Sequence, residues 1–284
     1  MNQEKLKSLK LAANKVRQGI IEATYGAKAG HPGGSLSSAE VFAYLYNQEM
    51  KIDPKNPQWE ERDRFVLSKG HTAPGLYAAL AYRGYFPVED LPTFRHIDSY
   101  LQGHPSMRMV PGVDMSSGSL GQGVSTACGM ALGFKFQNKP NRVYSLLGDG
   151  ELAEGQVWEA LMFAAHYKLD NLCIVIDNNG LQIDGPVEKV MNSYPIADKV
   201  LAFGWNLVEV QNGHDLEELE KAFDAARATK GKPTCILMHT TKGKDVSYME
   251  NSVEWHGKAP NEAEYHQAMD ELTAIYTAIE KGER

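Results

Sequence analysis

The sequence predicts an α/β fold, in which a parallel sheet carries helices on both faces. Five short segments are mostly apolar, which is typical of strands that are buried on both sides. These segments are residues 65–67, 143–147, 172–176, 207–210 and 234–238. Stretches with a helical spacing of apolar residues separate them. This alternation indicates a parallel sheet built from strand–helix–strand units.

Helices are expected between and around these strands. In the first of them Leu6, Leu9, Ala13 and Val16 recur at near-helical spacing. The expected helices span residues 4–28, 74–82, 118–136, 156–166, 196–203, 215–229 and 262–281. The run from Ser37 to Glu40 has the spacing of a capping box, which would open one more helix.

The organisation of the chain indicates one domain and a terminal helix. Residues 85–117 are rich in Pro, His, Gly and Ser and are expected to be irregular; a loop of this length is usually functional. No stretch with the composition of a linker interrupts residues 30–260. We therefore expect a single α/β domain over residues 1–260, followed by a C-terminal helix within residues 261–284.

Charge and cysteine content exclude several classes of protein. The 284 residues include 29 Lys and Arg against 36 Asp and Glu, a net charge of −7, which argues against nucleic acid binding. No run of 18 apolar residues and no apolar leader is present, so neither a membrane span nor a signal peptide is expected. Cys128, Cys173 and Cys235 are predicted to be buried free thiols, typical of a reducing cytoplasm.

Polar residues directly follow two of the predicted strands. Asp149 lies between Gly148 and Gly150 after the second strand, and Asn179 follows the third. If these strands are neighbours, the two side chains meet at the edge of the sheet where ligands bind in such folds. A carboxylate and an amide oxygen suit Mg²⁺ or Ca²⁺, and glycine allows backbone amides to approach a phosphate. The alternative is that Asp-Gly and Asn-Gly form two ordinary turns.

Four histidines lie in glycine- and proline-rich loop sequences. They are His31, His71, His104 and His256, and together they predict a polar pocket that handles protons. A single loop histidine is more often a surface residue, so only the four histidines together predict such a pocket. The other five are interpreted as structural or exposed: His96, His166, His214, His239 and His266.

The segment Gly118–Gly123 precedes a predicted helix and offers backbone amides to an anion. Its Gly-x-x-Gly-x-Gly spacing differs from the dinucleotide fingerprint, and no strand directly precedes it. A nicotinamide-dependent dehydrogenase is therefore a weaker alternative.

Taken in order, these motifs resemble the N-terminal, thiamine diphosphate-binding domain of transketolase over residues 8–260. Gly-Asp-Gly at 148–150 and Asn-Asn at 178–179 resemble the motif of the wider thiamine diphosphate superfamily. The more specific segments are Gly30–Gly33, Ser68–His71, Gly103–Pro105, Pro111–Val113, Gly118–Gly123 and His256–Pro260. Deoxyxylulose-phosphate synthases share the two superfamily motifs, but the segment beginning at His256 fits transketolase better.

The resemblance implies a role for each matched position. Asp149 and Asn179 would be metal ligands, with the Leu181 carbonyl as a third. Residues around the cofactor would be His71, Gly118, Ser119, Leu120, Gly148, Asp149, Gly150, Glu154 and Asn179. His31, His104 and His256 would hold the hydroxyl groups of the reacting sugar and move protons. Glu154 would lie at the interface between two cofactor sites.

Two positions depart from the more familiar family pattern. Ser119 stands where proline is more common, and Leu181 stands where many relatives have isoleucine. Both positions are expected to act through backbone atoms, so neither change affects the interpretation.

The resemblance implies ketol transfer between sugar phosphates. It also implies that about half of the enzyme lies outside this sequence. In this family the glutamate that activates the cofactor comes from a separate pyrimidine-binding domain, for which the sequence shows no motifs. We therefore expect the N-terminal subunit of a split transketolase, an α2β2 assembly with a partner that carries the pyrimidine-binding and C-terminal domains. The length of 284 residues is the main reason for this expectation. The alternatives are a catalytically silent cofactor-binding or regulatory homologue, and a truncated full-length enzyme.

Overall fold

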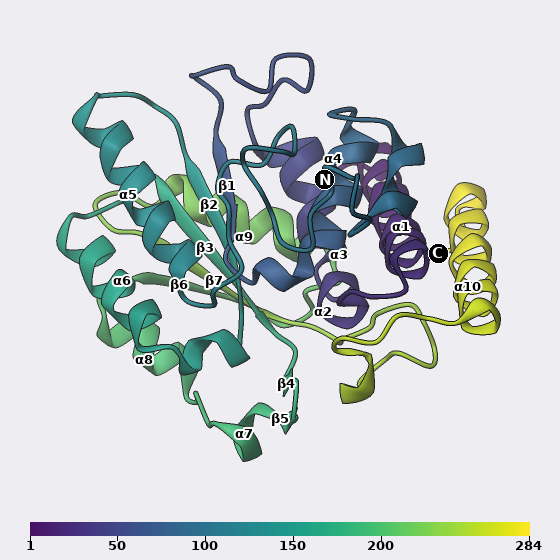
Figure 1. Cartoon of the computed structure of the whole chain (residues 1–284). Helices are drawn as coiled ribbons and strands as arrows, with labels where there is room; N and C mark the ends of the chain where they lie inside the picture. Colours follow the sequence, from purple (N-terminus) through teal and green to yellow (C-terminus); the bar gives the residue numbers. More distant parts are fainter.

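A computed structural model describes residues 1–284 and shows a five-stranded parallel sheet (Figure 1). The strand order is β1-β2-β3-β7-β6, and every neighbouring pair is parallel. The strands are β1 Arg64–Leu67, β2 Val143–Gly148, β3 Leu172–Asn178, β6 Asn206–Val210 and β7 Thr234–His239. The predicted α/β class and the position of each predicted strand are confirmed.

Side chains alternate along each strand between two separate hydrophobic cores, one on each face of the sheet. Tyr144 and Leu146 of β2 face the first core, whereas Val143 and Leu147 face the second. Helices α1 Gln3–Ala27, α3 Ala39–Tyr44, α4 Ala73–Arg83 and α9 Leu216–Ala228 contribute to the first core. Helices α5 Gln122–Phe136, α6 Gly155–His166 and α8 Ile196–Ala202 contribute to the second. The expectation of helices on both faces is confirmed (Figure 1).

The C-terminal helix, α10 Glu262–Lys281, packs along α1 at the outer side of the first core (Figure 1). Asn261 and Glu264 form a capping box at its start. Its Ala268 and Leu272 are fully buried and belong to the first core. The helix is therefore attached to the body of the protein by apolar packing.

Two local expectations were wrong. Ser37 and Glu40 do not form a capping box: Ser37 donates to Asp177, and Glu40 pairs with Arg17. The short helix α2 Pro32–Leu36 precedes them, and α3 begins at Ala39. The helix expected from residue 118 begins at Gln122, because Gly118 and Gly121 have φ values of +153° and +80°.

A small hairpin was missed in the sequence. Strands β4 Leu181–Gln182 and β5 Gly185–Pro186 pair with each other after β3, and α7 Val187–Val190 follows them. Residues 85–117 are irregular except for a 3₁₀ helix at Val88–Thr93. No helix has the length and apolarity needed to cross a bilayer. The three cysteines are buried and unpaired, as expected.

Ile174, in the middle of β3, is fully buried in the second core. We expect Ile174→Ala to lower the free energy of unfolding in urea by about 2–5 kcal/mol, because it leaves a cavity between sheet and helices. Ile97→Ala is the matched control, since Ile97 is 96% exposed. That control should change the free energy by less than about 0.5 kcal/mol. Equal effects of the two substitutions would contradict the assigned core.

Candidate active site

A cavity of about 260 Å³ lies beyond the carboxyl ends of β2, β3 and β7. In parallel α/β sheets this is the edge where ligands bind. Most of the predicted site residues line it: His31, His71, Gly118, Leu120, Gly148, Asp149, Gly150, Asn179, Leu181 and His256. The structure therefore brings together segments that are more than 200 positions apart in the sequence.

Asp149 is buried at the end of β2, and its carboxylate is held by backbone amides. Oδ1 accepts the N–H of Gly150 at 2.8 Å, and Oδ2 accepts the N–H of Gly180 at 2.5 Å. Because β2 and β3 are neighbours, the carboxylate bridges the turns that follow the two strands. Burial, together with the nearby carboxylate of Asp177, raises the pKa of Asp149 to about 7. A cation bound beside Asp149 would stabilise the ionised form of this carboxylate.

Asn179 and Leu181 present further oxygens to the same cavity. Asn179 Oδ1 accepts the Leu181 N–H at 3.1 Å, which holds the amide side chain in place. The Leu181 carbonyl accepts Lys242 Nζ at 3.1 Å, so a positive group already lies at this oxygen. The described residues contain no group of three or more His, Cys, Asp or Glu side chains arranged for a metal. A metal here would use one carboxylate with amide, carbonyl and phosphate oxygens, the donors that Mg²⁺ prefers.

Asp177 is fully buried behind the cavity and accepts bonds from several segments. Its Oδ2 lies 2.6 Å from Lys69 Nζ and 2.6 Å from the Ser37 hydroxyl, and its Oδ1 accepts from Thr240. The amide of Asn179 donates to Oδ2 at 3.0 Å. Burial would raise the pKa of Asp177, but Lys69 and these hydrogen bonds outweigh it and hold the pKa below its usual range.

Glu151 ties the glycine-rich loop to the ends of β1 and β2. Its carboxylate accepts the Ser68 hydroxyl at 2.5 Å, the Gly121 N–H at 2.9 Å and the Gly148 N–H at 3.1 Å. Burial raises its pKa, although these bonds oppose the shift. The loop that offers Gly118 to the cavity is therefore fixed by a buried carboxylate.

Three imidazoles form one wall of the cavity. The ring centroids of His31, His71 and His256 lie 5.2 to 5.4 Å from one another. Burial, followed by nearby positive groups, lowers the pKa of His31 to about 4 and that of His256 to about 3. Burial also lowers the pKa of His71. All three rings are neutral near pH 7 and can donate or accept hydrogen bonds.

Three predicted residues lie outside the lining of this cavity: His104, Ser119 and Glu154. His104 is exposed beside the loop, and a side-chain carbon added at Gly118 would lie 3.1 Å from its Cδ2 atom. Ser119 is exposed. Glu154 is also exposed at the start of α6 and lies against Gly121.

The fold and the cavity define a thiamine diphosphate-binding domain. The chain matches the family described as "Transketolase, thiamine diphosphate binding domain" over residues 8–275, and it belongs to that family. The cofactor of this family is thiamine diphosphate with a divalent metal, and the donor set at the strand ends fits both groups.

Two similar proteins have nearly the same length as this chain. The 6-deoxy-6-sulfo-D-fructose transketolase subunit SqwG of Clostridium sp. (strain MSTE9) is 46% identical, covering 92% of this chain and 94% of the relative. One of the subunits of the apulose-4-phosphate transketolase of Phocaeicola vulgatus is 41% identical, covering 97% of this chain and 98% of the relative.

Longer transketolases match only in part. The transketolase of Homo sapiens is 45% identical over 90% of this chain, which spans 41% of that protein. The transketolase structure from Leishmania mexicana superposes with a TM-score of 0.88 at 33% identity, covering 96% of this chain and 45% of that one. The chain therefore spans less than half of these longer relatives.

Four groups around the cavity were missed in the sequence: Lys69, Glu151, Asp177 and Lys242. Lys69 lies inside the segment Ser68–His71, and Asp177 directly precedes the Asn-Asn pair at 178–179, but neither residue was itself predicted to act. Lys242 follows β7, and the rule that polar residues at strand ends form sites applies to it only once the order of the strands is known. That rule needed the position of β7 beside β3, which the sequence does not reveal.

The raised pKa of Asp149 predicts that metal binding expels a proton. In the cofactor-free chain the carboxyl ¹³C signal of Asp149 should titrate with a midpoint of about 7. Because a cation binds only the ionised form, Mg²⁺ and thiamine diphosphate should lower that midpoint, and their affinity should rise with pH up to about 7. Asp149→Asn assigns the signal. A cofactor-free midpoint near the ordinary value of about 4 would contradict the prediction.

Proposed function

We propose that Asp149, Asn179 and the Leu181 carbonyl hold the divalent metal that anchors thiamine diphosphate. The adjacent strand ends support this assignment, since they place all three residues on one cavity. Gly148, Gly150 and the backbone of residues 118–120 would approach the diphosphate, since no side chain intervenes at the glycines. The metal is Mg²⁺ or Ca²⁺, because both take oxygen ligands.

The neutral histidines would bind and orient the sugar. Bound thiamine diphosphate supplies the carbon nucleophile that accepts and passes on a two-carbon unit. His31 and His256 would hold the hydroxyl groups of the sugar and move protons, with His104 at the outer edge, while His71 would contact the cofactor. Their low pKa values keep the rings uncharged, so each can accept a proton from one oxygen and donate one to another.

We further propose that this chain is the N-terminal subunit of a two-chain transketolase. The two relatives of similar length are both named as subunits, which supports a partner with the pyrimidine-binding and C-terminal domains. Glu154 is exposed, as a residue between two cofactor sites of an α2β2 assembly must be before assembly. The three buried free thiols support a cytoplasmic location.

The reaction proposed is the transfer of a ketol unit from a ketose phosphate to an aldose phosphate. Xylulose 5-phosphate is the default donor for the transketolase family. The relatives are named for 6-deoxy-6-sulfo-D-fructose and apulose 4-phosphate, so a different phosphorylated or sulfonated ketose is the main competing donor. The alternative function is a silent cofactor-binding homologue. The complete set of cavity residues favours an active enzyme over that alternative.

Reconstitution tests this function. The chain alone should show almost no ketol transfer, and the addition of a pyrimidine-domain partner purified from the native source should restore it. The reason is that a two-site cofactor pocket needs both chains to orient the reacting groups. Product formation is measured with a panel of ketose phosphates and sulfonates as donors. Light scattering of the complex measures its mass, with two copies of each chain expected.

Two results would contradict the proposal. Full activity of the chain alone would exclude the requirement for a partner. A stable complex that binds thiamine diphosphate but converts no donor in the panel would favour the silent homologue.

A further inference from the structure

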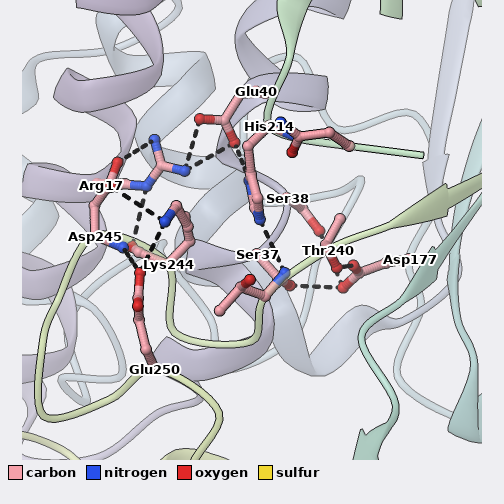
Figure 2. A network of polar contacts seen from close by, with 12 residues as sticks. Arg17, Ser37, Ser38, Glu40, Asp177, His214, Thr240, Lys244, Asp245 and Glu250 are labelled. Carbon is pink, nitrogen blue, oxygen red and sulfur yellow. Dashed lines mark hydrogen bonds and ion pairs between the residues drawn. The ribbon is translucent and has the colours of Figure 1, made fainter. Parts of the chain in front are cut away.

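A buried polar network packs against the segment that follows β7 (Figure 2). It joins Arg17 of α1, Glu40 of α3, His214 after β6 and Asp245 after β7. Arg17 is 2% exposed and Glu40 is 6% exposed. Buried charges of this kind are costly unless each one is paired, so their positions are tightly defined.

His214 links this network to the backbone after β7. Its Nδ1 atom lies 2.9 Å from Glu40 Oε2, and its Nε2 atom accepts the Thr241 N–H at 2.9 Å. An atom that accepts an N–H carries no proton, so the ring is neutral and its proton is on Nδ1, donated to Glu40. Glu40 thus selects the form of His214 whose Nε2 atom can accept the Thr241 N–H.

The two neighbours of Thr241 both belong to the site. Thr240 donates its hydroxyl to Asp177 behind the cavity. Lys242 points into the cavity, where its Nζ donates to the Leu181 carbonyl at 3.1 Å and lies 3.0 Å from His256 Nδ1. The buried network therefore contacts the backbone at the Thr241 amide, between Thr240 and Lys242.

A second contact fixes the other end of the segment. Arg17 Nε donates to the Lys244 carbonyl at 3.2 Å, and its guanidinium lies 3.4 Å from Asp245 Oδ2. Arg17 also pairs with Glu40 at 2.7 Å. The same ion pair therefore supports the contact at Thr241, through Glu40 and His214, and the contact at Lys244, through Arg17. The network therefore contacts the backbone on both sides of Lys242, at Thr241 and at Lys244.

The approach of His214 depends on a glycine. The Gly213 N–H donates to the His239 carbonyl at 2.7 Å. A side-chain carbon at Gly213 would lie 2.6 Å from Thr240 Cγ2 and still closer to Met238. The loop after β6 can contact the end of β7 because this position has no side chain.

We propose that His214, held in one form by Glu40 and Arg17, is a positioning residue that sets where Lys242 lies in the cavity. This inference rests on the proposed function in one respect: the ligand of the cavity is taken to be thiamine diphosphate with its metal. The effect of His214 passes through the Thr241 amide and requires no contact with that ligand.

The test compares His214→Asn with His214→Gln in the full-length chain. The longer Gln side chain places an oxygen where Nε2 lies and can still accept the Thr241 N–H, whereas Asn is too short. Hydrogen exchange of residues 240–244 should be about 10-fold faster in His214→Asn and nearly unchanged in His214→Gln, because only the first loses the bond. His266→Asn is the matched control, since His266 is exposed on α10.

Binding of thiamine diphosphate at fixed Mg²⁺, measured on the chain with its partner, gives the second readout. His214→Asn should raise the Kd about 10-fold, while turnover at saturating cofactor changes little. In a Lys242→Met background the same substitution should have almost no effect on Kd, because the side chain that it misplaces is gone. An undiminished effect in that background would overturn the proposal.

Two outcomes of the structural readouts would also overturn it. One is unchanged exchange of residues 240–244 in His214→Asn. The other, which needs no variant, is a ¹⁵N spectrum of the wild-type chain that shows His214 protonated on Nε2. Neither measurement uses the partner or turnover, so a failure of the transketolase assignment would leave them interpretable.

Discussion

The buried carboxylate of Asp177 holds together the segments that form the cavity. It accepts from Lys69 after β1, from Ser37 between α2 and α3, and from Thr240 after β7. These segments lie far apart in the sequence, and no strand pairing connects the turn at Ser37 to the sheet. Removing one partner of a buried ion pair typically costs about 3–5 kcal/mol, so the arrangement is strongly specified.

Asp177 and Asp149 show how two neighbouring carboxylates take different roles. Asp177 is satisfied by the side chains of the protein itself, and its pKa is held low. Asp149 accepts only two backbone N–H groups, and its pKa is raised by burial. A carboxylate has about four acceptor sites, so Asp149 keeps acceptor sites free for a ligand. The first carboxylate organises the cavity, and the second is available to what binds there.

The sequence predicted the features that depend on local patterns. The apolar strands, the polar residues at the ends of β2 and β3, and the loop histidines His31, His71 and His256 were found because each has a short signature. The neighbouring positions of β2 and β3 were confirmed. Glycine-rich segments also marked the places where the backbone approaches the cavity.

Features that depend on the order of the strands could not be predicted. Lys242 joins the site because β7 lies beside β3, and one sequence does not reveal that order. Ser37 and Glu40 have the spacing of a helix cap, but their side chains bind Asp177 and Arg17 instead, which are distant in the sequence. His214 was interpreted as structural or exposed, and its contact with Thr241 could be found only from the fold.

The most direct test of this account is metal-dependent cofactor binding by an Asp149→Ala variant. The affinity for thiamine diphosphate is measured by calorimetry on the chain with its partner, with Mg²⁺ and with a chelator. Asp184→Ala is the control, since Asp184 is exposed on the nearby hairpin. The account predicts that Asp149→Ala abolishes the Mg²⁺-dependent part of the affinity and that Asp184→Ala retains it. Unchanged Mg²⁺-dependent affinity in Asp149→Ala would contradict it.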